Sequence, residues 1–322
     1  MKQRPLGNTG FQVAPIIFGG NVFGWTVDEK RSFALLDAWV DAGFNAIDTA
    51  DMYSSWVEGN KGGESETIIG HWLQAHPSKR DKVLIFTKVG GDFGDDKRKG
   101  LKAGYIRLAV EASLKRLSIE TIDLYQSHFP DETVDDEETL SVYQDLIKEG
   151  KVRAIGASNY SATQLDRALK IAADKNLPAY QTLQPEYNLY DRNGYEGGLS
   201  DLCVAHNIGV IPYYSLASGF LSGKYRSEAD LGQSKRGEGI KKYLNNRGMR
   251  ILAALDEVSK RQNAKPAEIA LAWLLTRPAI TAPIASATSI EQMNSLKKAT
   301  EINLTQEDVI LLNDASSILP TD

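Results

Sequence analysis

Apolar residues along this chain gather in eight short runs that are apolar at nearly every position instead of at every second one. Strands buried on both faces of a parallel sheet have this pattern, whereas strands with one solvated face alternate apolar and polar residues. We therefore predict eight buried strands, at residues 15–19, 44–48, 83–88, 122–128, 152–157, 180–185, 209–214 and 281–285.

Helical periodicity separates these predicted strands. Phe33, Leu36 and Val40 recur at the i, i+3, i+7 spacing of one helix face, and the same spacing returns in later segments. Gly43 and Gly150 stand where a glycine ends a helix and hands over to the next strand. The chain therefore alternates strand and helix along most of its length.

Eight successive strand–helix units predict an α/β fold, a (β/α)₈ TIM barrel, which takes about 250 residues before insertions. We expect a single domain over residues 1–322. The Gly-rich start, RPLGNTGFQV, predicts a small N-terminal hairpin before the first barrel strand. The surplus length lies mainly at 216–247, a long loop after strand 7.

This long loop is polar and rich in glycine and basic residues. It is consistent with a solvated loop containing a short helix. It is equally consistent with a lid over an anionic ligand, because barrel active sites are built from the loops at the C-terminal strand ends. Its cationic residues are Lys224, Arg226, Lys235, Arg236, Lys241 and Lys242.

Composition and charge exclude several classes of protein. A net charge of −5 argues against nucleic acid as the main partner, since such binding needs a basic face. The single cysteine, Cys203, excludes an intrachain disulfide framework and favours a cytoplasmic location. The start lacks a signal-peptide pattern, and no apolar run is long enough to span a membrane. The four histidines form no metal-binding motif, so we expect no metal.

Four polar residues stand at or just beyond the ends of predicted strands. Asp48, Lys88 and His128 lie forty positions apart, about one strand–helix unit, and Tyr53 follows Asp48 in IDTADMY. The C-terminal ends of parallel barrel strands meet at one mouth, so we expect this polar quartet (Asp48, Tyr53, Lys88 and His128) to converge. Any one of the four could instead cap a loop or pack at the rim.

The polar quartet fits proton-coupled carbonyl chemistry. Tyr53 can donate a proton to a carbonyl oxygen, and a nearby Lys88 ammonium would lower the pKa of the phenol. Asp48 would keep Lys88 charged, and His128 would orient the carbonyl. An alternative is a Schiff-base lyase that uses Lys88 as its nucleophile, although that leaves Tyr53 and His128 without a role.

These residues resemble the aldo-keto reductase family over essentially the whole chain, and in particular its bacterial NADP-dependent oxidoreductases. The resemblance is carried by IDTADMY, FTKVG, YQSHFPD, IGASNY, QPEYN, YYSLASGFLSGKY and SATSIEQ, in this order. It implies an enzyme that reduces an aldehyde or ketone with a nicotinamide cofactor, NADPH, bound across the strand ends, and with Tyr53 as general acid.

The resemblance also implies the cofactor contacts. The nicotinamide would meet Ser158, Asn159, Gln184 and Tyr213. The ribose would lie over Gly20 and Asn21, and the pyrophosphate along Ser215, Leu216, Ser218 and Lys224. The adenosine would lie near Ser286, Thr288 and Gln292.

The sequence departs from the family pattern at both ends of this cofactor site. Tyr214 and Ser215 replace a serine and a proline that are frequent after strand 7, and Leu296 replaces an asparagine that faces adenine. Gln292 also completes a helix-capping box with Ser289. No Lys or Arg occurs in 286–292, so NADP rather than NAD would depend on Arg236 or Lys235, and NAD stays open.

Trp25, Trp56 and Phe129 follow strands 1, 2 and 4 and form the expected substrate wall, unless they are ordinary rim packing. Such a wall suits small apolar aldehydes or the face of a sugar. The potassium-channel β subunits share the reductase barrel, so a cofactor-sensing regulatory subunit is a further alternative. The natural substrate, the physiological direction and the oligomeric state stay open.

Overall fold

Eight parallel strands form the central sheet of the structure, a computed structural model that describes residues 1–94 and 98–318. All eight predicted strands are confirmed. Six are shorter than predicted, the strand predicted at 83–88 is shifted by one residue, and the strand predicted at 152–157 is one residue longer. In sheet order the strands are β10 (Ile284–Ala285), β3 (Ile17–Gly19), β4 (Ala46–Asp48), β5 (Leu84–Val89), β6 (Ile122–Ser127), β7 (Val152–Ser158), β8 (Thr182–Gln184) and β9 (Gly209–Val210). Residues 95–97 and 319–322 of the predicted 1–322 domain lie outside the described part.

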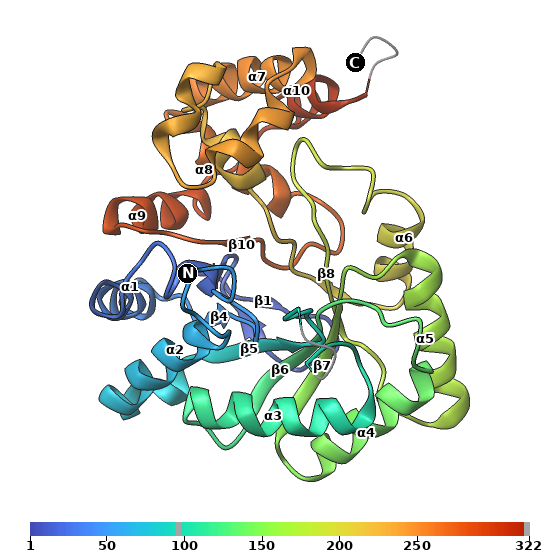
Figure 1. The fold of residues 1–322 in the computed structure, drawn as a ribbon. Coiled ribbons are helices and arrows are strands. Elements are labelled where there is room, and N and C mark those ends of the chain that lie inside the picture. Colours follow the sequence, from blue (N-terminus) through green and yellow to red (C-terminus); the bar gives the residue numbers. More distant parts are fainter. Residues whose placement is uncertain (95–97, 319–322) are drawn as a thin grey trace.

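The sheet curls so that its two edge strands meet. A parallel bridge pairs Val210 of β9 with Ile280, and the Ile284 amide donates to the Pro212 carbonyl at 2.8 Å. Helices lie around the outside of this sheet (Figure 1). The predicted (β/α)₈ barrel is therefore confirmed.

The predicted N-terminal hairpin is also confirmed and covers one mouth of the barrel. It consists of β1 (Arg4–Pro5) paired antiparallel with β2 (Gln12–Val13). Leu6 and Phe11 are buried in one apolar cluster with residues of the barrel strands, such as Ile17 and Phe86. Because the hairpin lies against the N-terminal strand ends, the C-terminal mouth is the one left for a ligand.

Helices α1 to α6 connect the first strands, and their ends follow the local sequence rules. Gly43 and Gly150, directly beyond the C-caps of α1 and α4, have φ angles of 91° and 75°, so both predicted helix ends are confirmed. The helices are α1 (Glu29–Asp41), α2 (Glu64–Ala75), α3 (Ala103–Leu117), α4 (Asp136–Lys148), α5 (Ala162–Lys175) and α6 (Gly198–Ala205).

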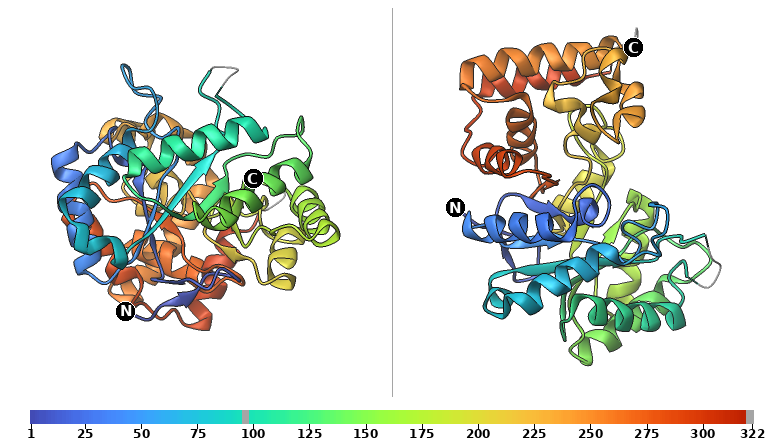
Figure 2. Two further views of the ribbon diagram at one scale, coloured as in Figure 1. Left: turned by 90° about the horizontal axis from the view of Figure 1, so that it is seen from below. Right: turned by 60° about the vertical axis from the view of Figure 1, so that its left-hand side comes forward.

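Within the described part of the chain, four more helices follow β9. They are α7 (Asn246–Gln262), α8 (Pro266–Leu275), α9 (Ile290–Ala299) and α10 (Gln306–Ser316). Figures 1 and 2 show α7 and α10 side by side at one end of the molecule. Three short 3₁₀ helices precede them, η3 (Ala217–Ser222), η4 (Glu228–Gln233) and η5 (Gly237–Tyr243), so the long loop after strand 7 is more structured than expected.

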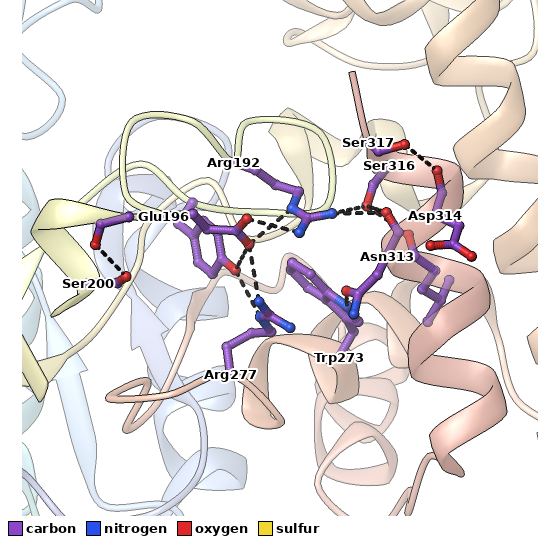
Figure 3. A network of polar contacts seen from close by, with 12 residues as sticks. Arg192, Glu196, Ser200, Trp273, Arg277, Asn313, Asp314, Ser316 and Ser317 are labelled. Carbon is purple, nitrogen blue, oxygen red and sulfur yellow. Dashed lines mark hydrogen bonds and ion pairs between the residues drawn. The ribbon is translucent and has the colours of Figure 1, made fainter. Parts of the chain in front are cut away.

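A network of polar contacts ties the C-terminal helix to the segment that follows β8 (Figure 3). Arg192 donates to both carboxylate oxygens of Glu196, at 3.0 and 2.9 Å, and to the Asn313 carbonyl at 3.0 Å. Trp273 of α8 donates to the Asn313 side chain at 2.9 Å. Helix α10 is therefore bonded to Arg192 of the segment after β8 and to Trp273 of α8.

Within residues 1–94 and 98–318, the structure has no helix that is both long and apolar enough to cross a membrane.

Candidate active site

The polar quartet lies at the C-terminal mouth of the barrel, as the sequence predicts. Asp48 is the last residue of β4, Lys88 lies near the end of β5, and His128 directly follows β6. Tyr53 comes from the loop after β4 and returns to Asp48, with 3.4 Å between its hydroxyl and Oδ2. Parallel pairing of the three strands places their ends side by side.

Lys88 is the centre of the quartet. Its ammonium nitrogen lies 2.7 Å from Asp48 Oδ2, 2.8 Å from the Thr49 carbonyl and 2.8 Å from the Tyr53 hydroxyl. Lys88 and Asp48 are 0% and 1% exposed, so this ion pair is removed from water. With three acceptors around it, the amine is fixed as a hydrogen-bond donor, which disfavours the Schiff-base alternative.

Two glutamine side chains complete the surroundings of Asp48. Gln184 donates to Asp48 Oδ1 at 2.9 Å, and Gln126 donates to the same oxygen at 3.3 Å. Gln126 was missed by the sequence reasoning. A signal existed, because Gln126 lies two positions before His128 and side chains on a strand share a face at every second residue.

Burial sets the protonation states in the quartet. The pKa of Tyr53 is raised well above its ordinary value, chiefly because the phenol is buried and secondly because the Asp48 carboxylate is adjacent. The expectation that Lys88 lowers this pKa is therefore not met, because the lost hydration of the phenolate and the adjacent carboxylate outweigh the ammonium. The pKa of His128 is lowered well below its ordinary value, chiefly because the imidazole is buried and secondly because of the Lys88 charge. Near neutrality Tyr53 is protonated and His128 is neutral.

His128 faces its neighbours mainly through its ring. The imidazole stacks on Phe129 with 4.7 Å between ring centroids and meets the Tyr53 ring edge-on at 6.1 Å. Its Nδ1 is buried and has no hydrogen-bond partner among the described residues. A buried polar atom without a partner is costly, and active sites are a common place for one.

The residues expected at the nicotinamide end are brought together beside the quartet. Asn159 donates to the His128 carbonyl at 2.9 Å and accepts from the Tyr213 hydroxyl at 2.7 Å. The Ser158 hydroxyl donates to the Gln184 carbonyl at 2.8 Å. Residues from three different strand ends therefore form one connected polar wall.

One cavity of about 830 Å³ joins the quartet to the predicted cofactor residues. Asp48, Tyr53 and His128 line one part of it, while Lys88 lies beneath. Gly20 and Trp25 are not part of its lining. Predicted cofactor residues that line the cavity are Asn21, Ser158, Asn159, Gln184, Tyr213, Ser215, Leu216, Ser218, Lys224, Arg236, Ser286, Thr288 and Gln292.

Gly20 lies behind the cavity wall. A Cβ atom at this position would come within 2.8 Å of the Asp48 carbonyl oxygen and 3.1 Å of the Ser65 hydroxyl. The absence of a side chain at Gly20 therefore allows the loop after β3 to approach β4 closely, and Asn21 is the residue of this turn that lines the cavity.

The long loop after β9 closes over part of the cavity. Arg236 reaches across to Asn21, with 3.5 Å between Nη2 and Oδ1, and its guanidinium lies 5.2 Å from the centre of the Trp25 ring. Lys235 also lines the cavity. Arg226, by contrast, pairs with Asp256 outside the lining. One part of the loop thus covers part of the cavity, and another part forms a solvated outer face with ion pairs.

At the expected adenosine end, Gln292 is engaged in helix capping. Its Oε1 accepts from the Thr288 amide at 2.8 Å, and the Ser289 hydroxyl accepts from the Gln292 amide at 3.2 Å. The predicted capping box is therefore half correct, since the side chain bonds Thr288 instead of Ser289. The Ser286 hydroxyl lies within 2.8 Å of Asn21 Oδ1, so it is tied to the loop after β3.

Two of the three expected substrate residues line the cavity. Trp56 and Phe129 are half-exposed at its rim, whereas Trp25 packs edge-on against Trp56 with 5.8 Å between ring centroids. Trp25 therefore supports Trp56 and Arg236 from outside the lining.

Residues 15–316 match the sequence profile of the Aldo/keto reductase family. The chain is 33% identical over 320 residues to the uncharacterized oxidoreductase YrpG of Bacillus subtilis, covering 98% of this chain and 95% of that protein. It is 31% identical to the aldo-keto reductase AMT2 of Alternaria alternata, covering 98% and 92%. A probable voltage-gated potassium channel subunit beta of rice, Oryza sativa, is also 31% identical, covering 94% and 92%.

Proposed function

Because the chain belongs to the aldo/keto reductase family, and is thereby an NAD(P)H-dependent oxidoreductase, we propose that it reduces an aldehyde or ketone with Tyr53 as the general acid and NADPH as the reductant. One observation carries the assignment of Tyr53. The Lys88 ammonium lies within hydrogen-bond distance of both the Asp48 carboxylate and the Tyr53 hydroxyl, next to a cavity of ligand size. The phenol is therefore the proton donor nearest to a buried positive charge.

The proton transfer follows from these contacts. Burial and Asp48 keep Tyr53 protonated until a carbonyl oxygen accepts its proton. The phenolate that remains is stabilised by Lys88, which Asp48 holds in place and charged. Lys88 therefore acts most strongly after the proton has left, which favours the transition state over the bound carbonyl.

His128 contributes orientation in this scheme. Its pKa is lowered by burial and by Lys88, so the imidazole is neutral and has one N–H to donate. A hydrogen bond from this N–H to the carbonyl oxygen would align the oxygen with the Tyr53 hydroxyl and polarise the carbonyl group. Stacking on Phe129 holds the imidazole plane.

The cavity residues fit a nicotinamide dinucleotide. Ser158, Asn159 and Gln184 offer the amide and hydroxyl groups that a carboxamide needs, and the Tyr213 ring lies beside them. A pyrophosphate or a 2′-phosphate would suit the cations of the cavity lining, which are Arg31, Lys224, Lys235 and Arg236. When bound, the cofactor supplies the hydride to the carbonyl carbon. The preference for NADP over NAD rests on Lys235 and Arg236.

A second candidate function is that of a cofactor-sensing subunit, supported by the similarity to the protein named as a probable potassium channel subunit beta. The two candidates differ in turnover. A reductase releases oxidised cofactor and continues, whereas a sensing subunit would oxidise one equivalent of NADPH slowly and retain it.

The proposed function is tested by titrating NADPH and NADH into the protein while following its fluorescence, then by following NADPH oxidation with a panel of aldehydes and ketones. Multiple turnovers with at least one carbonyl compound support the reductase. A single equivalent oxidised across the whole panel, with tight NADPH binding, supports the sensing subunit and contradicts the reductase.

A further inference from the structure

Three large aromatic side chains stay half-exposed around the catalytic end of the cavity. Trp56, Phe129 and Tyr214 are 48%, 43% and 45% exposed, and all three line the cavity. They come from three different loops, after β4, β6 and β9. Exposed apolar surface that gathers in one place commonly marks a binding site.

Each of these three aromatics packs against a residue deeper in the site. Phe129 stacks on His128, and Trp56 meets the Tyr53 ring with 6.1 Å between centroids. Tyr214 meets the Tyr213 ring at 5.1 Å, at an interplanar angle of 67°. The three aromatic rings therefore lie beside Tyr53, His128 and Tyr213 and line the same cavity.

Tyr214 holds its position in an unfavourable backbone conformation. Its φ angle is 50°, in the left-handed region that a bulky residue rarely adopts. Two hydrogen bonds to its carbonyl fix this geometry, from the Asn188 side chain at 3.0 Å and from the Ala217 amide at 2.7 Å. Strained residues that the surrounding structure holds in place cluster at functional sites.

The tyrosine at this position also departs from the serine that is frequent in the family. A serine would leave the β9 side of the cavity mouth open, whereas Tyr214 adds a ring there. Tyr53 and Tyr214 line the same cavity, and after burial and Asp48 the Tyr214 phenol contributes to the raised pKa of Tyr53. Tyr214 thus stands at the reacting end of the cavity.

We propose that Tyr214 is a specificity-determining residue that, together with Trp56 and Phe129, holds the planar ring of an aromatic aldehyde over Tyr53. This inference rests on the proposed reductase function and names its substrate class. A planar aromatic ring would gain contact with these three side chains. A polyhydroxylated aldehyde would need several hydrogen-bond partners, and the three aromatics offer only the Tyr214 hydroxyl and the Trp56 N–H.

The test compares benzaldehyde, whose ring is planar, with cyclohexanecarbaldehyde, whose ring is not, and uses glyceraldehyde as the polyhydroxylated probe. The two ring aldehydes also differ in carbonyl reactivity, but this difference cancels when their ratio is compared between wild type and variant. The kcat/KM values are measured with NADPH for the wild type, Tyr214→Phe and Tyr214→Ser. An aromatic pair contributes about 0.5–1.5 kcal/mol, so Tyr214→Ser should lower the benzaldehyde-to-cyclohexanecarbaldehyde ratio roughly 2- to 12-fold. Tyr214→Phe keeps the ring and should retain the preference.

Two measurements separate this effect from others. The dissociation constant for NADPH, from fluorescence titration, should stay within about twofold of the wild type, because the lost contacts are to the substrate. If Tyr214→Ser unfolds, Tyr214→Leu takes its place, since it also removes the ring. If Tyr214→Ser leaves the benzaldehyde-to-cyclohexanecarbaldehyde ratio unchanged while cofactor binding is intact, the inference is overturned. A wild type that prefers glyceraldehyde also overturns it. Both results leave the reductase assignment standing. A wild type that reduces no carbonyl compound overturns both.

Discussion

Asp48→Asn should destabilise the fold strongly, because Asp48 accepts hydrogen bonds on both carboxylate oxygens. Lys88 donates to Oδ2, while Gln126 and Gln184 donate to Oδ1. Asparagine has a single acceptor oxygen, so its amide NH₂ would face either the lysine or the glutamine donors. Leaving one partner of a buried ion pair uncompensated costs about 3–5 kcal/mol.

This destabilisation should also depend on pH. Burial lowers the pKa of Lys88, and Asp48 is the group that opposes this shift most, so in Asp48→Asn the folded-state pKa falls further below that of the unfolded chain. Between these two pKa values the unfolded state binds more protons, so the stability of the variant rises with pH. The difference in the free energy of unfolding between wild type and variant should therefore become smaller from neutral pH toward about pH 10.

Urea unfolding of wild type and Asp48→Asn at several pH values measures both effects. The double variant Asp48→Leu with Lys88→Met is the matched control, because it removes both charges and should recover a large part of the loss. A loss below about 1 kcal/mol at neutral pH, typical of an exposed pair, would refute the reasoning. So would a gap that is independent of pH.

Two further substitutions test other parts of the structure. Arg236→Ala should raise the dissociation constant of NADPH far more than that of NADH in fluorescence titrations, because a guanidinium is a strong partner for a 2′-phosphate. Equal effects on the two cofactors would remove Arg236 from phosphate recognition, and Arg226→Ala is the control because Arg226 pairs with Asp256 outside the cavity lining. Arg192→Ala should lower the free energy of unfolding by about 1–3 kcal/mol, since it removes charge-assisted bonds to Glu196 and leaves the Asn313 carbonyl without that donor. Lys170→Ala, which breaks an exposed pair with Asp166, should leave the unfolding midpoint in urea unchanged, and an equal shift for both variants would count against the network.

The barrel was predictable because its strands are buried on both faces and therefore apolar at nearly every position. Once parallel strands are predicted, their C-terminal ends must share one mouth, which is why Asp48, Lys88 and His128 could be placed together. The bounds of helix α7 were not predicted, although Ile251, Leu255 and Val258 follow a helical spacing.

Other features depend on three-dimensional surroundings that a sequence does not specify. The pKa of Tyr53 moves opposite to the expectation, because depth of burial decides whether the lysine or the desolvation has the larger effect. Gln292 could have faced a ligand or capped its helix, and the competing amide of Thr288 is evident only in the fold. The sequence left Arg236 and Lys235 as candidates for a 2′-phosphate, and only the fold shows that both line the cavity.

The central claim, that Tyr53 delivers the proton, is tested most directly by Tyr53→Phe. The substitution removes the hydroxyl and leaves the ring against His128 and Trp56. The rate of NADPH oxidation with a reducible aldehyde should fall by roughly 10²–10⁴, while the dissociation constant of NADPH stays unchanged. Turnover near the wild-type rate, with intact cofactor binding, would contradict the account.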